Sequence, residues 1–400
     1  FSQKTDDQGG YHLYPVDTMI TRTFLAILFS ALLLFTGCDQ QSVVEPSGNT
    51  VRICVIGPFS GPNRLKGKQA LDGIRTAIQM QPLLRNGDAI ELVIEDDGDD
   101  PSLTGEALQK LAGIDEVSAI LIASTSNTVL DIRSLANDLE IPIIALTATH
   151  PDVRKQNDYI SQLVFDDTMQ GMVAALFVMD ELLIEKVAVF VNPDSTYSSN
   201  LANEFIRQYT AIGGQITATV PVNEGEEDYT AILKDLRNRE TRLLYLPIAD
   251  RNLLRIAEAA VALEWEPEMM GGDGILDSFL NHYPKQARLL EGMMATNYFD
   301  DNSPLTPFGE RAEKTYRSLF GGIPNTYNAL GVESYALLLN AMNRCEKPDN
   351  RECINPMIRS TRDITGVIGN ISINADGRAD RPLIITRVRN GQVEFVVKVY

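Results

Sequence analysis

The chain has 400 residues, and its 54 acidic and 35 basic side chains give a formal net charge of -19. This acidic balance excludes nucleic acid as a partner, because phosphate backbones bind clustered lysine and arginine. Single hydrophobic cores stop growing at about 250–300 residues, so we expect the chain to fold as two packed lobes.

A short apolar segment lies near the N-terminus. Arg22 precedes an apolar run over 24–35, which small residues follow. A membrane-spanning helix needs about 20 apolar residues, whereas this run has about a dozen. It therefore predicts a signal peptide over 19–37 that is cleaved, not a membrane span. Residues 1–18 carry no pattern, and we interpret them as upstream sequence outside the fold.

The signal peptide ends in the sequence LFTGC (34–38), which resembles the bacterial lipobox. The resemblance implies that Cys38 is acylated and becomes the first residue of the mature protein. The alternative is an ordinary secretory signal with a chance cysteine. Asp39 resembles the signal that retains lipoproteins on the periplasmic side of the inner membrane. The polar residues of 38–50 then predict a short tether between the lipid and the folded body.

From residue 51 onward, short β-branched runs alternate with longer amphipathic stretches. Strands are expected at 51–56, 90–95, 119–122, 141–146, 187–191, 215–220, 243–246 and 293–297. Helices are expected at 68–80, 103–111, 128–139, 170–183, 199–212, 229–237, 253–263, 307–319, 328–343 and 354–360. Two last strands, 382–389 and 392–399, flank an Asn-Gly step, which is a strong hairpin signal. Alternation of this kind predicts an α/β fold with parallel sheets.

The four cysteines fall into three contexts, the first being the lipid candidate Cys38. Cys54 lies inside an apolar run, so we expect a buried small hydrophobe and not a reactive thiol. Cys345 and Cys353 flank a polar loop, and export to an oxidising compartment favours a local disulfide between them. The spacing permits this bond without proving it.

No catalytic signature is recognisable in the sequence. The chain has only three histidines, so the sequence gives little support for a three-histidine metal site or a Ser-His-Asp triad. Residues 61–68 resemble a phosphate loop, but the spacing of the glycines is wrong and Gln69 replaces the hydroxyl that would hold magnesium. Residues 95–100 lack the spacing of a calcium loop, so we expect a solvated turn there. These observations predict a binding protein that is not an enzyme and has no cofactor or metal.

Four loops at the carboxyl ends of predicted strands form the candidate site, because open parallel sheets bind ligands there. The loops are 57–62, 123–128, 147–151 and 271–274. The first three bring hydroxyls and backbone N–H groups to helix starts, which suits a carboxylate. Ser126 and Thr149 could instead serve only as helix caps. The fourth loop places Asp273 among glycines, and an isolated acid beside an anion site predicts a zwitterionic ligand.

Several short motifs recur in a fixed order along residues 51–400. They are VIGPFSGP (55–62), GKQALDG (67–73), IPIIALTATHPD (141–152), DTMQG (167–171), DYTA (228–231), YNALG (327–331), TGVIG (365–369) and NADG (374–377). Their order and spacing resemble the type I periplasmic binding proteins, in particular the leucine/isoleucine/valine-binding subfamily of ABC-importer receptors. No single motif carries the resemblance alone.

The resemblance implies two doubly wound parallel-sheet lobes joined by three hinge crossovers, with the ligand trapped when the lobes close. On that basis lobe 1 comprises 51–166 plus 295–365. Lobe 2 comprises 167–294 plus 366–400.

The resemblance also implies roles for individual residues. Ser126, the backbone around Thr147 and the Thr149 hydroxyl would hold the ligand carboxylate. Asp273 would pair with the ligand's α-amino group, and Tyr197 would be the aromatic residue contributed by the second lobe.

Four positions depart from the subfamily's pattern. Lys66 stands where tyrosine is frequent, and Ala249 where another aromatic residue often lies. Gln162 replaces a frequent arginine, and Ser198 the usual glycine. Lys66 is either a solvated loop residue or a residue that selects a ligand with an extra acidic group.

The function implied by the resemblance is that of a lipid-anchored substrate-binding protein. It would deliver an amino acid or a similar small polar solute to an ABC permease. The alternative is a lipoprotein of the same fold that regulates an envelope enzyme or a sensor by protein contact. Such a role would not require Asp273 together with Ser126 and Thr149.

Overall fold

A computed structural model describes residues 44–113, 117–223, 225 and 228–399. The predicted signal peptide, Cys38, Asp39 and the first part of the tether lie outside the described residues. Within the described part, no helix is long and apolar enough to span a bilayer. Pro46–Tyr400 form one compact unit, whose strands make three sheets.

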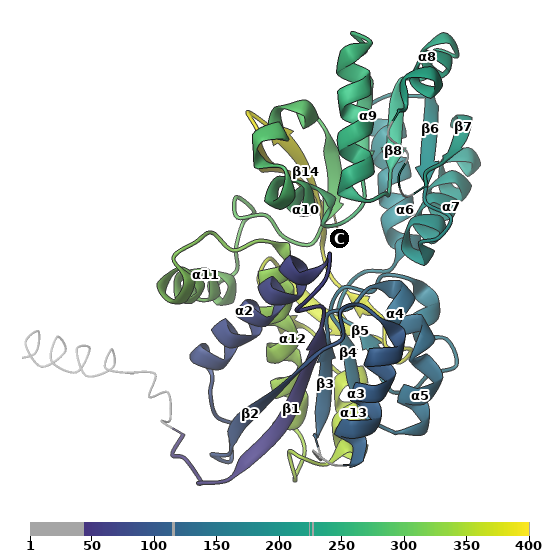
Figure 1. The fold of residues 1–400 in the computed structure, drawn as a ribbon. Helices are drawn as coiled ribbons and strands as arrows, with labels where there is room; N and C mark the ends of the chain where they lie inside the picture. The colour runs from purple at the N-terminus through teal and green to yellow at the C-terminus, as the bar shows by residue number, and fades with distance from the viewer. Residues whose placement is uncertain (1–43, 114–116, 224, 226–227, 400) are drawn as a thin grey trace, which may run out of the picture. The chain divides into compact units, whose positions relative to one another are not determined.

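The first sheet has five parallel strands in the order β2-β1-β3-β4-β5 (Figure 1). The strands are β1 (Thr50–Gly57), β2 (Ala89–Asp96), β3 (Ala119–Ile122), β4 (Ile143–Ala145) and β5 (Ile160–Gln162). The helices packed with this sheet are α2 (Arg64–Met80), α3 (Pro101–Gly113), α4 (Ser126–Asp131), α5 (Arg133–Asp138), α11 (Pro307–Phe320), α12 (Thr326–Met342) and α13 (Arg351–Arg359).

Strand β1 explains why helices cover both faces of this sheet. Val55 packs in the core formed with α2 and α12, whereas Cys54 and Ile56 pack with α3, α4 and α5. Successive side chains of a strand point to opposite faces, so an unbroken apolar run needs cover on both. The expected burial of Cys54 is confirmed, since its exposed fraction is 0%.

Helices α2 and α12 approach closely because each presents a glycine at the crossing. A Cβ on Gly73 would lie 2.1 Å from the carbonyl oxygen of Asn328. A Cβ on Gly331 would lie 2.1 Å from that of Ala70. Both glycines belong to motifs that carried the family resemblance, and their role is to allow this helix contact.

The second sheet has seven strands in the order β15-β14-β10-β9-β8-β6-β7, and its last two strands in sequence run antiparallel. The strands are β6 (Lys186–Val191), β7 (Gln215–Pro221), β8 (Leu243–Leu246), β9 (Glu268–Gly271), β10 (Met294–Asn297), β14 (Leu383–Arg389) and β15 (Gln392–Val399). The helices are α6 (Asp167–Leu176), α7 (Thr196–Ala211), α8 (Thr230–Asn238), α9 (Asp250–Ala262) and α10 (Ile275–His282). The expected hairpin is confirmed, with Asn390 at φ 53° and Gly391 at φ 74°.

The α/β class and the parallel sheets are confirmed, but several elements differ from expectation. Strands β5 and β9 were missed. The helix expected over 128–139 is two helices that break at Ile132. The helix expected over 170–183 starts earlier, because Asp166 caps it by accepting from the N–H of Met169 (3.1 Å), and it ends in a π-helical turn, η2 (Phe177–Glu181).

Strand pairing also shifts two of the expected lobe boundaries. Strand β10 hydrogen-bonds to β9 and β14, so residues 295–297 lie in the second sheet and not with lobe 1. The third sheet consists of β11 (Ile364–Thr365), β12 (Asn370–Ile373) and β13 (Ala379–Asp380). It lies beside the first sheet, because the Gln162 N–H donates to the carbonyl of Gly377 (2.8 Å). Contacts between residues far apart in sequence set both boundaries.

The chain passes between the two large sheets three times, after β5, after β10 and before β14. One residue from each passage meets at a buried ion pair. Arg381 Nη1 lies 2.8 Å from Glu333 Oε2, and each side chain is 1% exposed. The guanidinium also donates to the carbonyl of Leu163 (3.2 Å) and lies 5.4 Å from the ring centroid of Tyr298. This ion pair therefore ties the three crossovers to α12.

The disulfide between Cys345 and Cys353 is present, with a Cα–Cα distance of 5.9 Å. It joins the segment after α12 to the first turn of α13. The local pairing favoured by the sequence is thus confirmed.

Candidate ligand-binding site

A cavity of about 420 Å³ is lined by loops of both large sheets. The loops follow β1, β2, β3 and β4 of the first sheet and β6, β8 and β9 of the second, and Tyr327 of α12 completes the lining. All are carboxyl ends of parallel strands, the edge where open α/β sheets place their ligands. Ser126, Thr147, Tyr197 and Asp273 of the predicted site line this cavity.

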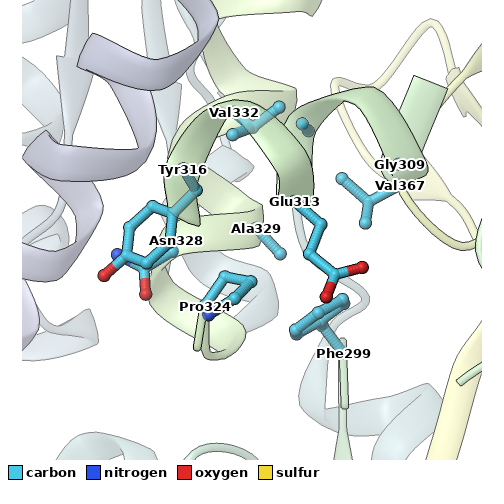
Figure 2. Close-up of a pocket in the computed structure, with 10 residues that line it drawn as sticks. Phe299, Gly309, Glu313, Tyr316, Pro324, Asn328, Ala329, Val332 and Val367 are labelled. Carbon is cyan, nitrogen blue, oxygen red and sulfur yellow. The ribbon is translucent and has the colours of Figure 1, made fainter. Parts of the chain in front are cut away.

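A second pocket, shown in Figure 2, lies between α11 and α12. Its side chains are mostly apolar, among them Phe299, Val332 and Val367. The volume is about 10 Å³, which is room for a single water molecule at most. The candidate site is the cavity at the carboxyl ends of the strands, because the predicted residues Ser126, Thr147, Tyr197 and Asp273 meet there.

Ser126 is arranged to donate a hydrogen bond into the cavity. Its Oγ accepts from the backbone N–H groups of Thr149 (3.2 Å) and His150 (3.3 Å). A hydroxyl that accepts twice still has its own hydrogen to donate. Thr147 stands next to it, with its hydroxyl donating to the carbonyl of Ser124 (3.0 Å).

Thr149 does not line the cavity, although we expected its hydroxyl to meet the ligand. The side chain is fully buried behind Ser126. The Thr149 hydroxyl lies near Asp167 and acts to lower the pKa of that carboxyl group. Thr149 thus supports Ser126 through its backbone N–H.

Asp273 follows β9 and holds a half-buried carboxylate in the cavity. Its Oδ1 accepts from Gln170 Nε2 and from the Tyr197 hydroxyl, each at 3.0 Å. Burial raises the pKa of Asp273, and the two hydrogen bonds oppose that rise. A Cβ on Gly272 would lie 2.2 Å from the Tyr197 oxygen, so the glycine makes room for this contact. Gln170 lies in the DTMQG motif (167–171), but its contact with Asp273 was not expected from the sequence.

The acidic segment 95–100 contains the expected turn, and Asp96 and Asp100 are exposed, but the segment is not solvated throughout. Asp97 is fully buried and accepts from the hydroxyls of Ser124 and Thr104. Asp96 accepts from the backbone N–H of Phe59 (2.8 Å). Asp96 thus satisfies a backbone N–H of the first binding loop, and the hydroxyl donors are why Asp97 is tolerated in the core. Across the described residues, no group of three His, Cys, Asp or Glu side chains could hold a metal ion.

Asp99 completes this support from the cavity wall. It adopts a left-handed backbone at φ 64°. Its Oδ1 accepts from the Thr125 N–H and the Thr128 hydroxyl, each at 2.9 Å, and its Oδ2 accepts from Asn63 Nδ2 (2.8 Å). Asp99 therefore fixes the loop that presents Ser126.

Asn127 bridges the two sides of the cavity. Its Oδ1 accepts from the Thr196 N–H (3.0 Å) and the Thr196 hydroxyl (2.7 Å), and its Nδ2 donates to the carbonyl of Asp194 (3.3 Å). These bonds join the start of α4 to the start of α7.

We expect Asn127→Ala to weaken ligand binding by at least about 10-fold, because it removes three hydrogen bonds that each contribute about 0.5–1.5 kcal/mol to the closed arrangement. Titration calorimetry measures the affinity, and small-angle scattering should show a larger radius of gyration. Thr196→Val removes one of the three bonds and should have a smaller effect. Unchanged affinity and scattering in Asn127→Ala would show that the bridge does not hold the cavity closed.

Asp167 is a fully buried acid at the start of α6. Asn200 Nδ2 donates to its Oδ2 (2.8 Å). Burial raises the pKa of Asp167 to about 8, with the nearby Thr149 hydroxyl and the hydrogen bond from Asn200 opposing this rise. In the native protein the group therefore keeps its proton at neutral pH.

This shift predicts a pH-dependent stability with a defined sign. Between about pH 4 and about pH 8 the unfolded chain has released the Asp167 proton while the native protein retains it, so stability falls as pH rises through that window. Asp167→Asn removes this slope and should gain more than about 1 kcal/mol relative to the native chain between pH 5 and pH 8. Urea unfolding of the native chain and of Asp167→Asn at pH 5 and at pH 8 measures the change in the free energy of unfolding. Asp180→Asn, at an exposed acid, should show no such gain; an equal gain there would contradict the assignment.

Loops of two α/β halves surround one cavity that holds an acid and hydroxyl groups, which is the arrangement of a two-lobed solute-binding protein. The chain matches the periplasmic binding protein family model over residues 50–392. The Leu/Ile/Val-binding protein homolog 1 of Brucella melitensis is 24% identical over 359 residues, covering 87% of this chain and 94% of that protein. Homolog 2 of Brucella abortus is 24% identical over 370 residues, covering 90% and 96%.

Solved structures show the same relationship. The leucine-binding protein LivK of Thermotoga maritima has a TM-score of 0.80 and 27% identity, covering 88% of this chain and 99% of that one. LivJ of Streptococcus pneumoniae, solved with isoleucine, has a TM-score of 0.79 and 23% identity, covering 87% and 99%. The chain belongs to the periplasmic binding protein family, in the type I branch that includes the leucine/isoleucine/valine-binding proteins. This is a family of binding proteins and not of enzymes.

Proposed function

We propose that the chain is the extracytoplasmic substrate-binding protein of an ABC importer and that it binds an α-amino acid in the cavity. The observation that carries the proposal is the presence of Asp273 and the Ser126 hydroxyl in one cavity, on loops of opposite sheets. The Ser126 side would hold the α-carboxylate, and Asp273 would pair with the α-ammonium group. Burying both charges of a zwitterion is tolerated only when each has a partner.

Similar proteins support an amino acid as the ligand. LivJ of Streptococcus pneumoniae was solved with isoleucine, and a substrate-binding protein of Desulfitobacterium hafniense with leucine. A solute-binding protein of Rhodopseudomonas palustris holds benzoate, so the fold also accommodates carboxylates that lack an amino group. In this chain, Asp273 favours a ligand with an ammonium group.

Binding would be coupled to lobe closure. A ligand that contacts loops of both sheets stabilises the closed state by its higher affinity for that state. The permease would then recognise the closed, loaded protein. Attachment of Cys38 to lipid on the periplasmic side of the inner membrane would raise the local concentration of the receptor at its permease. Mass spectrometry of the mature N-terminus tests this anchor, and Cys38→Ser should release the protein from membranes.

A thermal-shift screen against amino acids and small carboxylates tests the ligand class. A ligand that binds only the native state raises the melting temperature, by about 2.7 kcal/mol of stabilisation at 100 times its dissociation constant. We expect α-amino acids to give the shift and the matching carboxylates without an amino group to give none. If no amino acid shifts the melting temperature, the alternative of a lipoprotein that regulates an envelope enzyme or sensor by protein contact is favoured.

A further inference from the structure

One lysine is the only basic side chain that lines the cavity among the described residues. Lys66 lies in the first turn of α2, where it is half-buried and faces the cavity. It is therefore not the solvated loop residue that was one of the two sequence-based interpretations. No described carboxylate forms an ion pair with its ammonium group.

Three acids share the cavity with Lys66, and one of them, Asp194, is exposed at the rim. Asp99 uses both carboxylate oxygens in hydrogen bonds, to the Thr125 N–H and to Asn63 Nδ2. Asp273 accepts two hydrogen bonds on Oδ1, and the charge of Lys66 lowers its pKa against the effect of burial. Lys66 and Asp273 thus interact electrostatically without an ion pair between them.

Closing the cavity around a ligand removes water from Lys66. An unpaired buried charge is strongly unfavourable, costing several kcal/mol per ion, whereas a charge that meets a counter-ion in good geometry is tolerated. A leucine or isoleucine side chain would offer the ammonium group only methyl groups. An acidic side chain would offer it a carboxylate.

We propose that the ligand is an amino acid with an acidic side chain, whose second carboxylate pairs with Lys66. This inference rests on the proposed function, which assigns the α-carboxylate to Ser126 and the α-ammonium group to Asp273. Ala249, at a position where the subfamily often has an aromatic residue, presents only a methyl group to the cavity. The cavity lining therefore includes a cation at Lys66 and has no aromatic ring at residue 249.

Titration calorimetry with L-glutamate, L-aspartate and L-leucine tests the inference. The native chain should bind one of the two acidic amino acids at least about 30-fold more tightly than leucine, the effect of about 2 kcal/mol for a desolvated charge pair. Lys66→Met should lose that preference by a similar factor and bind leucine as well as or better than before. Lys68→Met is the matched control, because this exposed lysine lies two residues further along the same helix and outside the cavity; its preference should equal that of the native chain.

The outcomes separate this inference from the proposed function. If the native chain binds leucine as tightly as glutamate and aspartate, or if Lys66→Met keeps the acidic preference, the role of Lys66 is overturned and the amino-acid receptor stands. If none of these or other amino acids binds, the proposed function itself fails. Lys66→Gln, which keeps a polar side chain of similar length, provides the same comparison should the methionine variant fold poorly.

Discussion

Asp273→Asn should weaken amino-acid binding by at least about 100-fold while leaving the protein folded. Asparagine keeps the oxygen that accepts from Gln170 and Tyr197, so the local hydrogen bonds survive. What is lost is the charge opposite the ligand's ammonium group, and an uncompensated buried charge costs about 3–5 kcal/mol. Calorimetry with the amino acid that gives the largest thermal shift measures the loss.

Asp194→Asn is the matched control for that experiment. Asp194 also lines the cavity, but it is exposed at the rim. Its neutralisation should change the affinity less than about threefold, because exposed charges interact through water. Equal losses in both variants would indicate a general effect of negative charge, and undiminished binding by Asp273→Asn would remove the assigned ammonium site.

Arg381→Met should lower the free energy of unfolding by about 3–5 kcal/mol, since it leaves the Glu333 carboxylate buried without its partner. The same substitution removes the contacts with Leu163 and Tyr298, so all three crossovers lose their common attachment. Urea unfolding followed by circular dichroism measures the change in midpoint and slope.

Two comparisons isolate the charge in the Arg381 experiment. The double variant Arg381→Met/Glu333→Gln should recover part of the loss, because glutamine is neutral and still accepts from the Val367 N–H that now bonds to Glu333 (2.7 Å). Arg52→Met breaks an exposed pair with Glu91, whose side chains are 47% and 44% exposed, and should cost less than about 1 kcal/mol. If the double variant is no more stable than Arg381→Met, packing and not charge explains the loss.

Much of the fold could be predicted because its strands are mostly apolar runs that alternate with longer amphipathic helices. Strand β8 lies where its apolar run predicted it, and the Asn390-Gly391 step predicted the hairpin, since few other residues adopt two consecutive positive φ angles. Strands β5 and β9 were missed because their sequences, ISQ and EMMG, mix apolar residues with polar ones or glycine, whereas β8 is the unbroken apolar run LLYL. The expected lobe boundary at residue 295 was wrong for a different reason. It depends on which strands β10 pairs with, and that pairing joins residues far apart in the sequence.

The site residues that could be predicted are those that line the cavity directly, from a loop at the end of a strand. Ser126, Thr147, Tyr197 and Asp273 all line the cavity. Residues that act through distant partners were missed. Gln170 contacts Asp273, a partner 103 positions away, and nothing in the local sequence around either residue indicates this bond.

The Cys345–Cys353 bond has a consequence for how the protein is produced. It restrains the start of α13, the helix whose Arg359 donates to the carbonyls of Asn157 (2.9 Å) and Ile160 (3.1 Å) at the edge of the first sheet. Disulfides form in oxidising compartments, so a chain made in a reducing cytosol would lack this covalent restraint. Recombinant material should therefore be exported or refolded in a redox buffer before the stabilities of variants are compared.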